Sequence, residues 1–99
     1  MTQQSLHELR QKTESIFRRY NITKAGVFGS FARGETRKKS DIDLLVRYGE
    51  VYSLFKLMDL KGELEKKLGK EVDLVDEKCV KKLVKSYIEK DLVVFYEKR

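Results

Sequence analysis

Two carboxylates stand two residues apart at the start of an apolar run, SDIDLLV, where they are Asp41 and Asp43. Burying one unpaired carboxylate is costly, and two neighbouring carboxylates repel each other. If the run is a β-strand, residues i and i+2 point to the same face, so the two side chains lie side by side, with Cβ atoms roughly 6–7 Å apart. That separation suits two oxygen ligands of one hard cation.

A third carboxylate stands in a later apolar segment, EVDLVD. If the two segments are neighbouring strands, Asp73 lies beside the aspartate pair, on the face opposite to Val72 and Leu74. Three carboxylates without a thiolate or imidazole favour magnesium or manganese over zinc, and such a site can hold two ions around a phosphate. Glu71 and Asp76 remain rivals for the third position. A D-x-D pair alone is explained better by an acidic strand edge, and the third carboxylate on the matching face is what favours a metal site.

A glycine–serine pair, Gly29 and Ser30, precedes the aspartates by ten residues, at the point where a short strand is expected to meet a helix. Backbone N–H groups at a helix start bind phosphate, glycine allows close approach, and the serine hydroxyl adds a donor. The alternative is a tight turn with serine as helix cap. A P-loop is not supported, because Glu35 stands where lysine is required. Two alternatives stay open for Arg33: it could reach a phosphate, or it could pair with a carboxylate.

Helical and strand patterns alternate along the chain. Apolar residues at helical spacing predict three amphipathic helices, over residues 5–20, 54–68 and 80–88. Ser5 and Glu8 form a plausible capping box for the first of them, and one or two helical turns are expected at 30–34 with Ser30 as cap. Short apolar runs predict four strands, at residues 24–28, 41–46, 72–75 and 92–96.

This alternation predicts an α/β or α+β fold, a small mixed β-sheet of about four strands flanked by helices. The sheet is expected to be mixed because the connection between Phe28 and Asp41 has only twelve residues, which is short for a parallel crossover. The 99 residues fit one domain, 1–99.

Composition limits the class of protein. The chain has 22 basic and 16 acidic residues and a net charge of +6, which is compatible with a nucleic-acid partner. The alternative is a solvated surface, because charged residues make up 38% of the chain and are spread over several segments. No apolar run is long enough to span a membrane, and the start of the chain lacks the apolar core of a signal peptide. A cytoplasmic protein is therefore expected.

Taken together, GSFARGE and SDIDLLV, at this spacing, resemble the signature of the nucleotidyltransferase superfamily that shares its fold with polymerase-β-type palms. The short chain is similar to the minimal nucleotidyltransferases, and the resemblance covers most of its length. It implies binding of ATP and of Mg²⁺, as two ions, with Mn²⁺ as the alternative. Asp41 and Asp43 would ligate both ions, and Asp73 the ion that activates the acceptor hydroxyl. Gly29 and Ser30 would hold the β- and γ-phosphates.

The resemblance also implies a partner. Minimal nucleotidyltransferases are typically paired with small all-helical HEPN proteins in toxin–antitoxin systems, where they transfer AMP to a tyrosine hydroxyl of the toxin. Because the chain ends directly after its fourth predicted strand, the acceptor is expected to belong to another molecule. Two other functions stay open: an antitoxin with a vestigial metal site that acts by binding alone, and a nucleic-acid-directed transferase. Against the latter, basic residues are not interleaved with aromatic ones, as a single-strand binder would need.

Overall fold

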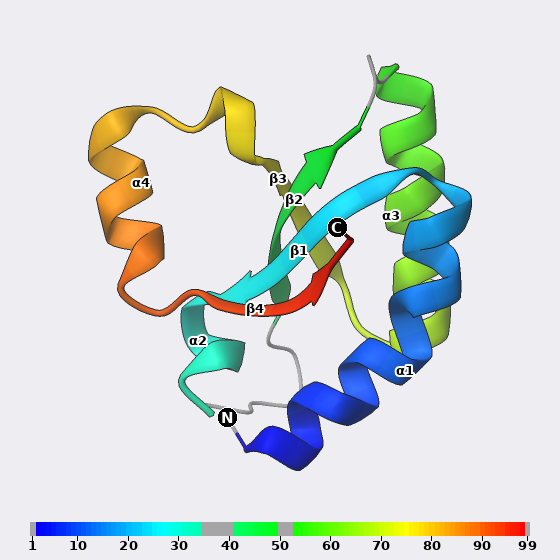
Figure 1. The fold of residues 1–99 in the computed structure, drawn as a ribbon, viewed down its shortest axis with the longest axis horizontal. Coiled ribbons are helices and arrows are strands. Elements are labelled where there is room, and N and C mark those ends of the chain that lie inside the picture. Colours follow the sequence, from blue (N-terminus) through cyan, green and yellow to red (C-terminus); the bar gives the residue numbers. More distant parts are fainter. Residues whose placement is uncertain (1, 35–40, 50–52, 99) are drawn as a thin grey trace.

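A four-stranded mixed sheet lies at the centre of the molecule, in the order β3-β2-β1-β4 (Figure 1). The computed structural model describes residues 2–34, 41–49 and 53–98. The strands are β1 (Ile22–Phe28), β2 (Ile42–Tyr48), β3 (Val72–Asp76) and β4 (Val93–Glu97). β1 pairs antiparallel with β2 and β4, whereas β2 pairs parallel with β3. The mixed sheet predicted from the short first connection is confirmed.

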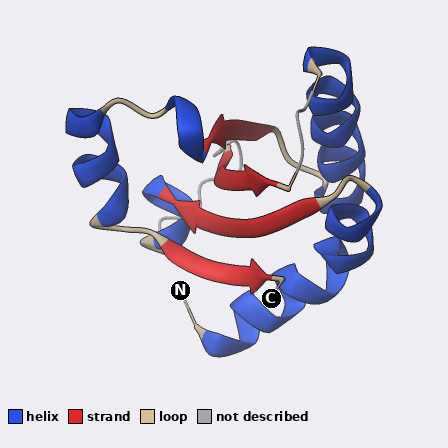
Figure 2. Ribbon diagram, turned by 45° about the horizontal axis from the view of Figure 1, so that its top comes forward, coloured by secondary structure: helices blue, strands red, loops and turns tan. Residues whose placement is uncertain are grey.

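Two long helices, α1 (Gln3–Arg19) and α3 (Leu54–Leu68), cover one face of this sheet (Figures 1 and 2). The core lies between these helices and the strands, and its largest fully buried side chains include Phe17, Ile22, Ile42, Leu44, Leu60, Leu64, Val27, Val46 and Val72. On β2 every second residue enters this core, as the sequence pattern predicts. Of the described residues, no helix is both long and apolar enough to cross a membrane.

The first helix begins two residues earlier than its apolar spacing predicts. Thr2 is the N-cap, and its hydroxyl accepts a hydrogen bond from the backbone N–H of Ser5 at 3.0 Å. The predicted capping box of Ser5 and Glu8 is therefore wrong, because another residue of the same capping class stands one turn earlier.

The short helix α2 (Gly29–Ala32) also starts earlier than predicted. β1 stays extended up to Phe28, which occupies the N-cap position without a side-chain cap. Ser30 therefore lies inside α2, and the prediction that it caps this helix is wrong.

The helix α4 (Lys82–Glu89) lies on the sheet face opposite to α1 and α3, after the 3₁₀ turn η1 (Glu77–Cys79) (Figure 2). The sequence pattern predicts an amphipathic helix over residues 80–88, but most of its apolar stripe is not covered by another element. Ile88 is the buried residue of α4, whereas Leu83, Val84 and Tyr87 are exposed. The physical reason is that the spacing of apolar residues defines a helix face but does not say whether another element covers it.

Substitutions at two glycines of α3 can distinguish the effect of helix propensity on stability from the effect of a left-handed backbone conformation. A Cβ at Gly62 or at Gly69 would meet no heavy atom within 4 Å, but Gly69, the C-cap, has φ +69°. We expect Gly62→Ala to raise the free energy of unfolding by about 0.5–1 kcal/mol, because alanine favours the helix. Gly69→Ala should lower it by about 1–2 kcal/mol, because an L-residue is strained there. Urea unfolding measures both, and a gain in both variants would contradict the assigned helix end.

Candidate active site

Asp43 and Asp73 lie directly opposite each other on β2 and β3, in the parallel register of the two strands. Ile42 and Leu44 on β2, and Val72 on β3, are buried. Because side chains alternate along a strand, the two aspartates point to the sheet face that α1 and α3 leave open. The prediction that the third carboxylate lies beside the D-x-D pair is confirmed for Asp43 and Asp73.

Asp41 directly precedes β2 and is half-buried. Its negative charge acts on Asp43, so the two residues are electrostatic neighbours as the D-x-D spacing predicts. The segment before Asp41, residues 35–40 with their basic run, lies outside the described residues.

The two rival carboxylates differ from Asp73 in their surroundings. Asp76 is the N-cap of η1, where its carboxylate accepts hydrogen bonds from the backbone N–H of Lys78 at 2.9 Å and from the Cys79 thiol at 3.6 Å. Glu71 precedes β3, and its carbonyl oxygen accepts the backbone N–H of Ile42 at 2.9 Å. Asp73 is therefore the carboxylate that the strand register brings to Asp43.

The neighbouring carboxylates and its burial both act on Asp43. Burial raises the pKa of the Asp43 carboxyl, and the charge of Asp73, a hydrogen bond with Asp73 and the charge of Asp41 raise it further. A raised pKa means that the ionised form destabilises the folded state. The metal-free protein therefore gains stability as the pH falls through the folded-state pKa of Asp43.

The chemistry of the donor set fits a hard divalent cation. All three candidate ligands are carboxylates, which suit Mg²⁺ or Mn²⁺, and a dication between them would offset their repulsion. Within residues 2–34, 41–49 and 53–98, no three His, Cys, Asp or Glu side chains already lie close enough together to hold a metal ion. Asp41, Asp43 and Asp73 thus form a group of neighbouring carboxylates and not a closed ligand cage.

Gly29 is the residue of the glycine–serine motif that lies next to the aspartates. Phe28, at the end of β1, is the cross-strand partner of Asp43, and the chain turns into α2 at Gly29 with φ +75°. A Cβ on Gly29 would lie only 2.5 Å from Oδ2 of Asp43. Glycine is required for two independent reasons, the left-handed backbone and the close approach to the carboxylate. The start of α2, including the half-buried Ser30, therefore adjoins the aspartates.

Arg33, directly after α2, pairs with a carboxylate. Its Nη1 atom lies 2.6 Å from Oδ2 of Asp91, in the turn between α4 and β4. Its backbone N–H donates to the carbonyl oxygen of Gly29 at 3.2 Å. Of the two alternatives that the sequence left open, the structure contains the carboxylate pair. This contact connects the helix that carries Ser30 with the end of α4.

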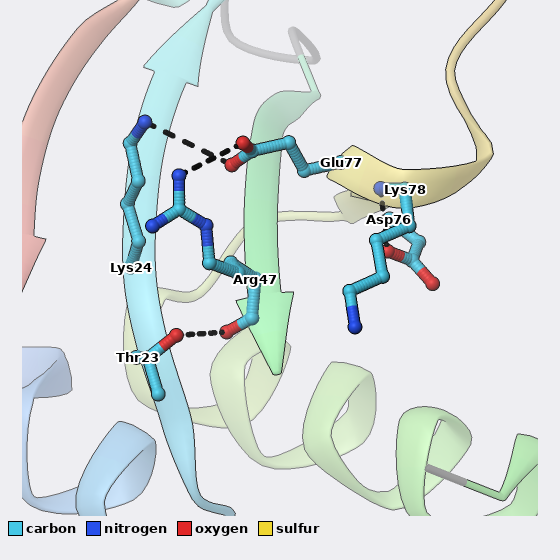
Figure 3. A network of polar contacts seen from close by, with 6 residues as sticks. All are labelled: Thr23, Lys24, Arg47, Asp76, Glu77 and Lys78. Atoms are coloured by element: carbon cyan, nitrogen blue, oxygen red, sulfur yellow. Dashed lines mark hydrogen bonds and ion pairs between the residues drawn. The ribbon is translucent and has the colours of Figure 1, made fainter. Parts of the chain in front are cut away.

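A second charged network, which sequence reasoning missed, lies at the opposite end of β2 (Figure 3). Glu77 of η1 accepts a hydrogen bond from Arg47 at 3.0 Å, and its other oxygen lies 3.8 Å from Nζ of Lys24. Burial acts to raise the pKa of Glu77, but Arg47, Lys24 and Lys85 outweigh it and hold that pKa below its usual value. No sequence motif predicts the contacts of Glu77 with Arg47 and Lys24, because they depend on the cross-strand pairing of Lys24 with Arg47.

The close approach of Gly29 to Asp43 can be tested with a double-mutant cycle. Gly29→Ala should lower the free energy of unfolding by about 1–3 kcal/mol, because the new Cβ is strained and collides with the carboxylate. In the Asp43→Ala background the collision disappears and only the backbone strain remains, so the loss should be smaller. Urea unfolding of the four proteins measures the coupling. Additive losses would show that the two residues do not touch.

The comparisons with known proteins agree with this arrangement. Residues 11–99 match the family model described as Polymerase beta, Nucleotidyltransferase. A candidate protein adenylyltransferase of Methanocaldococcus jannaschii is 42% identical over 84 residues, which cover 85% of this chain and 90% of the relative. The protein adenylyltransferase MntA of Thermococcus cleftensis is 39% identical over 75 residues, which cover 76% of each protein.

Solved structures share the fold. A candidate minimal nucleotidyltransferase is 34% identical, with a TM-score of 0.77 and coverage of 94% of this chain and 95% of that one. A chain from the complex of a tri-AMPylated Shewanella oneidensis HEPN toxin with its MNT antitoxin is 18% identical, with a TM-score of 0.72 and coverage of 93% and 72%. The chain therefore belongs to the polymerase-β-type nucleotidyltransferase family, and it is a nucleotidyltransferase with protein adenylyltransferases among its homologues.

Proposed function

We propose that this protein transfers AMP from ATP, in the presence of Mg²⁺, to a tyrosine hydroxyl of a small helical HEPN-type protein, and that it thereby acts as the antitoxin of a toxin–antitoxin pair. The observation that carries the proposal is the parallel register that sets Asp43 against Asp73, next to Gly29 at the start of α2. The homologous protein adenylyltransferases and the fold shared with the MNT antitoxin complex support the choice of reaction and partner.

The aspartates are proposed as the metal ligands. Asp41, Asp43 and Asp73 would hold two Mg²⁺ ions, or Mn²⁺, which when bound neutralise charge at the transferred phosphate and help to ionise the acceptor hydroxyl. Asp73 has an exposed side chain, so it can also accept the proton of the incoming hydroxyl. Asp43 is the more buried of this cross-strand pair, and its carboxylate lies close to the backbone of Gly29, at the start of α2.

The start of α2 is proposed to bind the distal phosphates of ATP. The backbone at Gly29 can approach a phosphate closely, and the Ser30 hydroxyl adds a donor. Arg33 places a positive charge directly after this turn, where Asp91 orients it. The acceptor oxygen then attacks the α-phosphorus, a new P–O bond forms to AMP, and the bond to the departing pyrophosphate breaks. The acceptor proton leaves through Asp73.

Replacing a metal ligand should abolish transfer without unfolding the protein. We expect Asp41→Asn and Asp43→Asn to lower the transfer rate at least about 100-fold, because charge stabilisation at the phosphate is lost. Asp76→Asn is the matched control, since Asp76 caps η1 and should leave transfer within a few-fold of wild type. The assay follows labelled AMP from ATP onto the proteins encoded in the two reading frames adjacent to this gene.

The outcomes of this assay separate the proposed reaction from its rivals. An AMP-transfer rate within a few-fold of wild type in either Asp41→Asn or Asp43→Asn would contradict the metal-dependent mechanism. If the wild type labels neither neighbouring protein, the proposed transfer is wrong. If Asp43→Asn still neutralises a toxic neighbour in cells, protection comes from binding alone.

Melting curves test the metal site without a partner. Mg²⁺ binds the folded protein and hardly the unfolded chain, so it should stabilise the wild type, by about 2.7 kcal/mol at a hundred times its Kd. Asp43→Asn should be at least as stable as the wild type in EDTA, because the carboxylate repulsion is reduced. The variant should lose most of the gain from Mg²⁺. An equal shift in both proteins would indicate salt screening, and a less stable variant in EDTA would indicate a structural partner for Asp43.

A further inference from the structure

The outer side of α4 exposes three large apolar side chains within little more than one helical turn. Leu83, Val84 and Tyr87, which we call the α4 patch, are 88%, 51% and 74% exposed. Single exposed apolar residues are common on protein surfaces, but a contiguous group on one helix is typical of an interaction site. None of these residues takes part in the core or in the proposed reaction, so their function lies elsewhere.

The α4 patch stands on the same side of the sheet as the aspartates. The inner side of α4 contacts the sheet through the buried Ile88, which lines a small pocket with Leu45 of β2. Leu45 lies two residues after Asp43, so both point to the same sheet face. Figure 1 shows α4 on this side of the sheet, with its C-terminal end near α2. A protein bound to the α4 patch would therefore lie next to the proposed active site.

Ion pairs lie on both sides of α4 along the chain. Before its first turn, Glu77 binds Arg47 of β2. After its last turn, Asp91 binds Arg33, the residue that follows α2 in the chain. A surface that is already in place loses less entropy on binding than a mobile one, so this anchoring favours docking. The Asp91 contact also joins the end of α4 to the residue that follows the turn carrying Ser30.

The segment that carries the α4 patch is basic. It contains four exposed lysines, Lys81, Lys82, Lys85 and Lys90, against one exposed carboxylate, Glu89. Two copies of this chain, each with a net charge of +6, would bring lysine against lysine if they met through this helix. An apolar surface bordered by Asp and Glu is complementary in charge, and opposite charges also accelerate association.

From these observations we propose that the α4 patch is the docking surface for the protein that supplies the acceptor hydroxyl, and that this partner presents an apolar face bordered by carboxylates. The proposal rests on the proposed function, because it names where the acceptor of that reaction binds. Docking on α4 brings the partner to the open sheet face, where Asp43 and Asp73 lie. The partner is thus positioned by contacts separate from those that bind ATP.

Leu83→Asp tests the apolar contact, with Leu54→Asp as its matched control. Both leucines are highly exposed and stand in the first turn of a helix, α4 and α3 respectively, where a carboxylate is favourable for the helix. We expect Leu83→Asp to weaken binding of the labelled neighbouring protein at least tenfold and to raise its KM without changing kcat. Leu54→Asp should match the wild type. Melting curves with ATP and Mg²⁺ should be equal in both variants, which shows intact folding and nucleotide binding.

Charge reversal tests the nature of the partner. Lys82→Glu on α4 should slow association about tenfold at low salt, and the difference from wild type should shrink at high salt because screening removes it. Lys12→Glu on α1 makes the same change in charge on an exposed helix position on the other side of the sheet, and it should associate at nearly the wild-type rate. Equal effects of the two reversals would contradict a specific acidic partner surface at α4.

The outcomes distinguish this proposal from the proposed function. If the wild type adenylylates a neighbouring protein and Leu83→Asp does so with the same KM, the docking surface is overturned and the reaction stands. If a partner binds through Leu83 but receives no AMP, the reaction is wrong and the surface stands. If light scattering shows a wild-type dimer that Leu83→Asp makes monomeric, the α4 patch joins two copies of this chain, and the proposed partner surface is wrong.

Discussion

The parallel pairing of β2 with β3 is the interaction on which the rest of the structure depends. It makes Asp43 and Asp73 cross-strand neighbours, although the repulsion between two neighbouring carboxylates opposes folding. Packing on the other side of the same strands offsets that cost, because Ile42 and Val72 are neighbours in the register and both are buried beneath the helices. α3 makes the crossover that parallel strands require. Its Glu65 accepts the backbone N–H of Val72 at 3.0 Å, which fixes the start of β3.

The two faces of β2 differ in chemical character and in what they contact. One face is apolar throughout and builds the core. The other face carries Asp43, Leu45 and Arg47, which are an acidic, an apolar and a positively charged residue. Asp43 belongs to the carboxylate group, Leu45 supports α4, and Arg47 binds Glu77. Because side chains alternate along a strand, seven residues are enough to serve both the stability of the fold and the chemistry of the site.

α4 packs on the sheet through apolar side chains, and ion pairs lie on both sides of it along the chain. The pairs Arg33–Asp91 and Arg47–Glu77 are partly exposed, so each contributes little free energy by itself. Ile88 and Leu45 are buried and supply the larger hydrophobic contribution. The ion pairs connect the segments on either side of the short helix to β2 and to the end of α2. The three apolar side chains of its outer face stay in solvent, on the same side of the sheet as the carboxylates.

The amino-acid sequence by itself determined the order of the main helices and strands and the two motifs of the site. The alternation around Asp43 predicted which face of β2 is buried, and the glycine–serine pair predicted the junction of a strand and a helix at Gly29, because side-chain periodicity and turn chemistry are local properties. Only the tertiary structure decided the pairing of Asp43 with Asp73, the carboxylate partner of Arg33 and the exposure of the α4 patch. These depend on strand register and on which elements meet. A local pattern states that a face is apolar, but the packing of distant segments decides what covers it.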